Sequence, residues 1–220
     1  MQALSFRPRA DQPGVTLSLM VLSDSPEGCA AVDVESGALV RLHYPGRPEA
    51  PLVPFSVVKA TLTDDPDGPD PTQPEAVSLD GPPEVVGRLR GRRARKLLGP
   101  LMLPSGAEPL GFPGSAVPYW MAPGDRPSLA LLSPEGGRIL LRRSAGGATF
   151  CQYRWRKAEV ELPLADRLAI QAMDAGPFAR LAGGAIERAV GFRPRHLVIA
   201  LSSPQDGRCY KVVSGLLPSP

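Results

Sequence analysis

Proline and glycine interrupt this chain so often that long helices are excluded from most of it. The sequence contains 27 Pro and 23 Gly in 220 residues. Proline breaks the hydrogen bonding of a helix interior and both residues favour turns, so short strands joined by fixed loops are expected instead. Aromatic residues make up only 5% of the chain, and the core must therefore be built mainly from Leu, Val and Ala. We expect a mainly β fold with minor α content.

Three segments share one strand–turn–strand pattern. Each has an apolar run, then a Ser-Pro turn that ends in Gly, then a second β-rich run. Two such runs separated by a short Pro/Gly turn predict a β-hairpin. The first and last copies also share Leu-Ser before the turn and Cys just after it. The three segments are residues 17–34, 129–141 and 195–217.

The repetition of this pattern predicts two related β-units, which the chain length allows. We place the first at 15–125, with acidic and basic loops and a Pro-rich connection, and the second at 126–217. Helical spacing of apolar residues over 164–173 and 178–190 predicts a short helical insertion in the second unit. Four or five short strands in each unit fit a small five-stranded Greek-key barrel.

Charge and cysteine content indicate the class of protein. The net charge is only +3, which does not by itself imply nucleic acid. Three cysteines are too few and too odd in number for a disulfide framework. No apolar run reaches the roughly 18 residues that span a membrane, and residues 1–14 form a polar arm without a signal-peptide core. We expect a reduced, cytoplasmic protein with no membrane segment.

Four segments, in this order, resemble the dual OB-containing domain family. They are VLSDSPEGCAAVDVESGALVRLHYP at 21–45, QPEAV at 73–77, TFCQYRWRKAEVELPLAD at 149–166 and LVIALSSPQDGRCYKVVSGLL at 197–217. The resemblance covers most of 15–217 and implies two tandem OB-like barrels. It also implies a nucleic-acid-binding or -sensing role, often beside defence or DNA-processing genes. The chain departs from the pattern where no Pro follows Arg41 and where Ala165 replaces a Thr before Asp166.

The densest run of positive charge lies in residues 88–96. Such cations add salt-sensitive affinity for phosphates without sequence specificity. Gly87 and Gly91 argue against a stable helix here, although one turn over 94–98 is allowed. The alternative is a solvated loop that balances, or is masked by, the acidic segment 64–84. The cluster consists of Arg88, Arg90, Arg92, Arg93, Arg95 and Lys96.

A second candidate surface combines cations with aromatic rings. OB barrels bind single strands with cations that follow the phosphates and rings that stack on bases. Strand alternation places Tyr153 and Trp155 on one face and Arg154 and Arg156 on the other. The alternative makes both rings core, which the usual burial of large aromatics favours. The surface would comprise Arg142, Arg143, Tyr153, Arg154, Trp155, Arg156 and Lys157.

Other chemistry finds little support in the sequence. There is no Cys-x-x-Cys, no paired His, no P-loop and no Rossmann glycine pattern, so we expect no metal and no cofactor. Cys29 would become a nucleophile only if the fold placed His43 or His196 beside it. The leading hypothesis is a non-enzymatic module that binds nucleic acid, expected to be single-stranded DNA or RNA. The alternative is a protein-interaction subunit that docks a partner effector.

Overall fold

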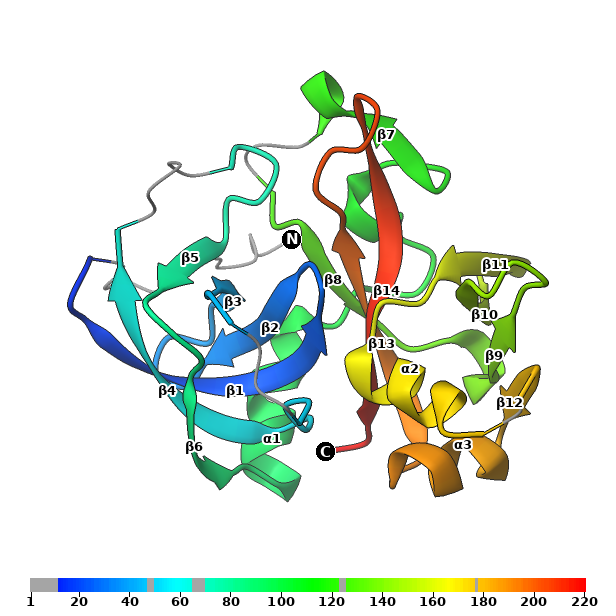
Figure 1. Ribbon diagram of the computed structural model, residues 1–220, viewed down its shortest axis with the longest axis horizontal. Helices are drawn as coiled ribbons and strands as arrows, with labels where there is room; N and C mark the ends of the chain where they lie inside the picture. The colour runs from blue at the N-terminus through cyan, green and yellow to red at the C-terminus, as the bar shows by residue number, and fades with distance from the viewer. Residues whose placement is uncertain (1–11, 47–49, 65–69, 123–125, 177) are drawn as a thin grey trace.

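The computed structural model describes residues 12–46, 50–64, 70–122, 126–176 and 178–220, so most of the predicted N-terminal arm lies outside the described residues. The chain is mainly β, as the sequence predicts, and Figure 1 shows two groups of strands side by side. The first group comprises β1 (Thr16–Ser25), β2 (Gly28–Asp33), β3 (Leu39–His43), β4 (Ser56–Thr63), β5 (Ala76–Leu79), β6 (Glu84–Arg88) and the helix α1 (Gly91–Leu98).

The second group lies C-terminal to these elements and contains two further helices. Short 3-10 turns cover Gly99–Leu101, Pro109–Gly111, Tyr119–Met121 and Glu135–Gly137. Its members are β7 (Ala116–Pro118), β8 (Leu129–Leu132), β9 (Ile139–Arg143), β10 (Thr149–Trp155), β11 (Ala158–Pro163), α2 (Arg167–Asp174), β12 (Arg180–Ala182), α3 (Gly184–Val190), β13 (Pro194–Leu201) and β14 (Arg208–Pro218).

The first unit is a closed five-stranded barrel. Its strands follow the order β1-β2-β3-β5-β4, and the pairing of β1 with β4 closes it. The β3–β5 pair is parallel and the other pairs are antiparallel, which is the OB arrangement. The β1–β2 turn needs glycine: Gly28 has φ +105°, and a Cβ there would lie 2.9 Å from the Leu42 carbonyl oxygen. β6 extends the sheet beyond β4.

The second unit is OB-like but forms a half-barrel of two four-stranded sheets. One has the order β11-β10-β9-β12 and the other β7-β14-β13-β8. A bridge between Leu164 and Val213 connects the end of β11 to β14. The helical insertion lies between β11 and β13 as predicted, although residues 180–182 form the edge strand β12 rather than helix. Pro177, between the two segments of predicted helical spacing, lies outside the described residues.

Two of the three predicted hairpins are confirmed. β1 pairs with β2, and β13 pairs with β14. The predicted hairpin at 129–141 is wrong, because β8 pairs with β13 whereas β9 pairs with β10 and β12. The 3-10 turn between them, with Gly136 and Gly137 both at positive φ, passes the chain from one sheet to the other.

Side chains on both faces of the barrel strand β1 are buried. Leu19 and Val21 point into the barrel and belong to its interior cluster. Met20 and Leu22, on the other face, pack in a cluster that includes Val198 of β13 and residues of β8 and β14. The face of β2 and β3 that OB barrels commonly use for oligonucleotides belongs to the same interface. The second unit therefore covers the usual binding face of the first.

A buried ion pair of the first unit is hydrogen-bonded to the second unit across this interface. Arg41 of β3 is 1% exposed, and its Nε lies 3.3 Å from Oε1 of Glu75. Its Nη1 and Nη2 donate to the carbonyl oxygens of Leu201 and Ser128, each at 2.9 Å. The carboxylate of Glu75 accepts a hydrogen bond from the Ser128 amide at 2.9 Å. The ion pair is thus formed within the first unit, and backbone groups of Leu201 and Ser128 in the second unit hydrogen-bond to it.

The three cysteines are buried free thiols. In the described part of the chain, no helix is long and apolar enough to cross a membrane.

Candidate nucleic-acid interface

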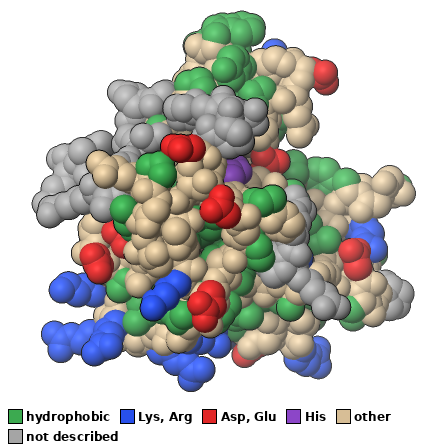
Figure 2. All heavy atoms as spheres, turned by 60° about the vertical axis from the view of Figure 1, so that its left-hand side comes forward, with side chains coloured by type: hydrophobic (Ala, Val, Ile, Leu, Met, Phe, Trp, Pro, Cys, Tyr) green, Lys and Arg blue, Asp and Glu red, His purple; other side chains and the backbone are tan. Residues whose placement is uncertain are grey.

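The cations of residues 88–96 form one exposed surface at the end of β6 and along α1. Figure 2 shows Lys and Arg side chains gathered at the lower edge of the molecule, where Figure 1 places these two elements. Every member of the cluster is exposed. We call it the β6–α1 surface, and it consists of Arg88, Arg90, Arg92, Arg93, Arg95 and Lys96.

The helix that carries most of these cations forms despite Gly91. The sequence argument against a helix is wrong here, because Ala94 and Leu98 are buried against the inter-unit core. Tertiary burial of one apolar stripe outweighs a weak intrinsic propensity. The other side of α1 is left to the basic side chains.

The charged side chains at the start of α1 are unfavourable for helix stability. Its N-cap Arg90 makes no side-chain capping bond, and its first turn has no acidic residue. Arg92 and Arg93 stand instead near the positive end of the helix dipole, where a cation costs about 0.3–1 kcal/mol. An anion bound beside this end would offset that cost.

The β6–α1 surface has no acidic partner within the described residues, since none of its members forms an ion pair there. The predicted masking by the acidic segment finds no support in its described part, where the Asp70 carboxylate accepts hydrogen bonds from Thr72. Asp65 and Asp67 of that segment lie outside the described residues.

Apolar side chains accompany this basic surface. Val85 and Val86 of β6 are among the large exposed hydrophobic residues. β6 pairs with β4 on one side, with a bulge between Val57 and Val58. The sequence analysis did not single out these valines. The signal was available, because two adjacent valines cannot both face inward from one strand.

The second candidate set, on β9, β10 and the turn after it, is held by carboxylates. We call its cations the β9–β11 surface: Arg142, Arg143, Arg154, Arg156 and Lys157. Nη2 of Arg142 lies 2.7 Å from Oε1 of Glu161 on β11. Arg143 forms an ion pair with Asp174 at the end of α2. The Arg142 guanidinium is the main cause of a lowered pKa at Glu161.

The turn between β10 and β11 is held in the same way. Nε of Arg154 lies 3.7 Å from a carboxylate oxygen of Glu135, and Arg156 pairs with Glu108. The Lys157 amide also donates to the Glu135 carboxylate. Sequence reading missed these acids. For Glu161 the signal was the hairpin register, which sets it opposite Gln152, on the same face as Arg154.

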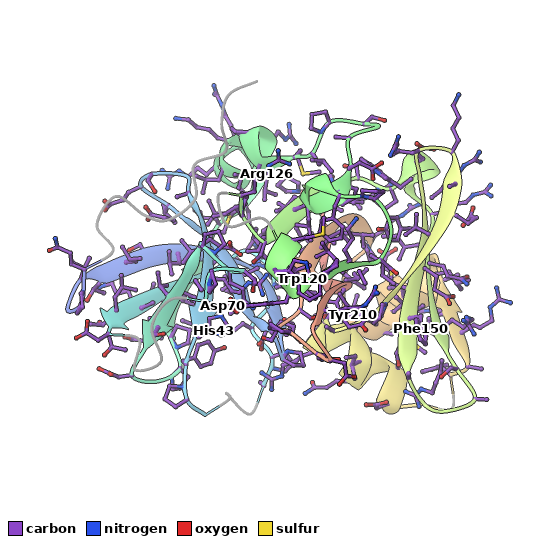
Figure 3. The ribbon with its side chains drawn as sticks, turned by 90° about the horizontal axis from the view of Figure 1, so that it is seen from above. His43, Asp70, Trp120, Arg126, Phe150 and Tyr210 are labelled. Carbon is purple, nitrogen blue, oxygen red and sulfur yellow. The ribbon has the colours of Figure 1, made fainter. Side chains whose placement is uncertain are left out.

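The two rings proposed for base stacking belong to the core. Tyr153 and Trp155 are 2% and 5% exposed and pack in the main cluster of the second unit. Nε1 of Trp155 donates to the carbonyl oxygen of Ala107 at 2.9 Å. Strand alternation puts Phe150, labelled near β10 in Figure 3, on the face of the sheet opposite to these two rings. The structure therefore corrects the stacking assignment and supports the core alternative.

The geometry also does not support Cys29 as a nucleophile activated by His43 or His196. Cys29 is fully buried, and burial raises the pKa of its thiol, which opposes thiolate formation. Nε2 of His43 instead lies 2.9 Å from Oε1 of Gln73, and Nδ1 of His196 lies 2.8 Å from the Ser133 hydroxyl. Across the described ranges, no three His, Cys, Asp or Glu side chains are grouped to hold a metal ion.

Comparison of the chain with protein-family models, with curated proteins and with solved structures gave no match. The resemblance to the dual OB-containing domain family thus stays an expectation carried by the residues quoted for it.

Proposed function

We propose that this protein binds nucleic acid, with a single strand as the expected form, through the β6–α1 surface. The observation that carries the proposal is the contrast between exposure and pairing. The six cations of this surface are exposed and unpaired within the described chain, whereas four arginines of the β9–β11 surface are each held by a carboxylate. Unpaired cations are free to replace the counterions of a phosphate backbone.

The same geometry predicts how binding should behave. Phosphate contacts from arginine give affinity without base recognition, so sequence preference should be weak. Val85 and Val86 offer apolar contact to unstacked bases, which a duplex does not present, and this favours a single strand. A wider role in defence or DNA processing rests on the family resemblance alone.

The test is fluorescence anisotropy with labelled single-stranded DNA, single-stranded RNA and duplex DNA, each titrated over salt. Arg92→Ala/Arg93→Ala/Lys96→Ala is expected to lower single-strand affinity at least about tenfold at low salt. The magnitude of the slope of log affinity against log salt concentration should decrease by about 2, because each of the three lost phosphate contacts accounts for about 0.7.

The matched control is Arg142→Ala/Arg143→Ala/Arg154→Ala, which removes the same charge from cations that already have acidic partners. We expect its affinity to change less than about threefold, because its phosphate contacts would first require breaking ion pairs. Equal losses in both variants would mean that only net charge matters. Absence of binding by the unaltered protein to all three probes would refute the proposal.

One observation favours the alternative of a protein partner. The 3-10 turn Tyr119–Met121 presents Trp120 and Met121 at 78% and 65% exposure, next to a half-exposed Tyr119. Seen from above in Figure 3, Trp120 lies between Asp70 and His43 on one side and Tyr210 on the other. Exposed Trp is typical of binding hot spots. Loss of a partner in Trp120→Ala, with nucleic-acid affinity unchanged, would support this second function.

A further inference from the structure

A cavity of about 460 Å³ lies in the second unit, between residues 108–115 and the strands β10 and β11. Figure 1 places β10 and β11 at the right of the molecule, away from β6 and α1 at the lower left. The volume falls within the range of roughly 300–1,000 Å³ typical of small-molecule sites. The cavity is therefore a candidate site distinct from the β6–α1 surface.

One wall of the cavity is apolar and aromatic. It includes the rings of Tyr153 and Trp155 and the aliphatic side chains of Val160 and Leu162. The hydrogen bond from Trp155 to Ala107 fixes the indole ring. The Tyr153 hydroxyl, by contrast, donates to no residue in the part of the chain that is described. This wall suits a flat apolar group, with a hydroxyl available to a polar head group.

Lys211 of β14 brings a buried ammonium to the same cavity. Its side chain is 4% exposed, and Nζ donates to the Phe112 carbonyl oxygen at 2.6 Å. Nζ also lies 4.2 Å from the centroid of the Phe112 ring, a cation–π contact. An ammonium has three donors, so two remain available. No carboxylate of the described residues pairs with it.

We propose that this cavity binds a small organic carboxylate with a flat apolar body, whose head group pairs with Lys211 and accepts a hydrogen bond from Tyr153. Buried charges in proteins are ordinarily paired, and a ligand carboxylate would supply the counter-ion that this ammonium lacks among the described residues. A polyanion such as nucleic acid is disfavoured, because a cavity of about 460 Å³ has room for one small molecule and offers one buried ammonium. The ligand is thus a small molecule rather than the partner of the β6–α1 surface.

The protonation state of Lys211 makes ligand binding at this cavity dependent on pH. Burial lowers the pKa of Lys211 to about 8, so the free site loses its positive charge as the pH rises through that value. Burial also raises the pKa of Tyr153, which keeps its hydroxyl a donor. Carboxylates and guanidinium groups ordinarily titrate outside the range of about pH 6.5–9.5. The other charged groups lining the cavity are Glu108, Arg156, Glu159 and Glu161.

Isothermal titration calorimetry with 2-naphthoate and its neutral analogue 2-naphthamide tests the proposal. At about pH 6.5 the carboxylate should bind the unaltered protein at least about tenfold more tightly than the amide, because only the carboxylate makes a charge-assisted hydrogen bond. Its affinity should fall at least about tenfold by about pH 9.5, as Lys211 loses its proton.

Lys211→Met should weaken 2-naphthoate at least about tenfold and abolish the preference over the amide. Lys157→Met, which removes an exposed lysine of the β10–β11 turn, should leave both unchanged. Lys211→Gln serves as a second variant, and circular dichroism checks that each is folded. Equal affinity for carboxylate and amide, unchanged binding in a folded Lys211 variant, or no saturable binding of 2-naphthoate would each overturn the proposal.

Discussion

The β6–α1 surface and the β9–β11 surface have nearly the same composition and opposite surroundings. Both are rich in arginine, and both attracted the same functional interpretation from sequence. On β6 and α1 the cations stand exposed without acidic partners in the described chain. On β9 and β10 they face carboxylates from β11, α2 and the turn before β9. The density of positive charge along a sequence is therefore a poor guide to free positive charge on a surface.

The buried ion pair between Arg41 and Glu75 extends this comparison to a third environment. Here a cation is fully enclosed, and its hydrogen bonds to the carbonyl oxygens of Leu201 and Ser128 join the first unit to the second. Exposed pairs such as Arg142–Glu161 contribute little to stability because solvent screens them, whereas breaking a buried pair leaves an uncompensated charge. The three environments thus contain unpaired exposed cations, paired cations at the surface, and a paired buried cation.

The largest expected effect is on stability, in the buried class. Arg41→Ala is expected to lower the free energy of unfolding by about 3–5 kcal/mol, because Glu75 would remain buried without its cation. Urea denaturation followed by circular dichroism measures the change. Arg95→Ala, on the β6–α1 surface, should stay within about 0.5 kcal/mol of the unaltered protein. Similar decreases in the free energy of unfolding for both variants would show that buried and exposed cations do not differ in their contribution to stability.

The carboxylates of the second unit also include exposed and buried members, and Asp166 is buried. Its Oδ1 caps α2 through the Ala169 amide and its Oδ2 accepts from the Leu216 amide, at 2.8 and 2.7 Å. Burial raises the pKa of Asp166 to about 6 despite these bonds, in contrast to the lowered pKa of Glu161 beside Arg142. Loss of its side-chain proton therefore opposes folding.

The sign of the resulting pH dependence follows from the raised value. The stabilisation from protonated Asp166 is fully present below about pH 4, its ordinary range, and is lost as the pH rises through about 6. The stability of the unaltered protein relative to Asp166→Asn should thus fall by about 2–3 kcal/mol between pH 4 and pH 7. Urea denaturation at several pH values measures this difference, and parallel profiles would contradict it.

Local chemistry explains what the sequence predicted well. The Ser-Pro-x-Gly turns and the alternating runs beside them specify the β1–β2 and β13–β14 hairpins, and the tandem OB-like architecture followed from their repetition. The same turn signal misled at 133–137, because nothing local says that the next strand joins a different sheet. The two-turn helix α1 was missed because its stability comes from contacts of Ala94 and Leu98 with distant strands.

Sequence could predict which cations of the candidate site are exposed, but it could not predict which of them are paired with carboxylates from distant parts of the chain. Exposure of the β6–α1 cations follows from a charged run that no core can hold. The pairing of Arg143 depends on Asp174, 31 residues away on α2. The covered face of β1 had a signal in the unbroken apolar run of residues 19–22, which indicates burial on both sides of a strand.

A smaller effect would come from converting one surface into the other. Glu135→Gln/Glu161→Gln removes the partners of Arg154 and Arg142 without changing a cation. We expect nucleic-acid affinity to rise about threefold to tenfold at low salt, since two freed cations can then contact phosphate. Fluorescence anisotropy measures the gain.

The control for this gain is Glu35→Gln/Glu187→Gln, which removes the same two charges at exposed positions of β2–β3 and α3. It should change affinity by less than about twofold, because it frees no paired arginine. An equal rise in both variants would show that pairing is irrelevant and that net charge alone limits binding.

The smallest expected effect concerns the turn that presents two cations of the β9–β11 surface. Arg156 and Lys157 both have positive φ, 53° and 62°, as a two-residue type I′ hairpin requires. That conformation suits Asn-Gly and is unfavourable for long side chains. Lys157→Gly should therefore raise the free energy of unfolding by about 0.5–1 kcal/mol, measured by urea denaturation. Lys96→Gly, within the regular helix α1, should instead lower it by about 1 kcal/mol; a loss of stability in both variants would show that the Lys157 side chain contributes more than backbone strain costs at this turn, because glycine keeps the amide that donates to Glu135.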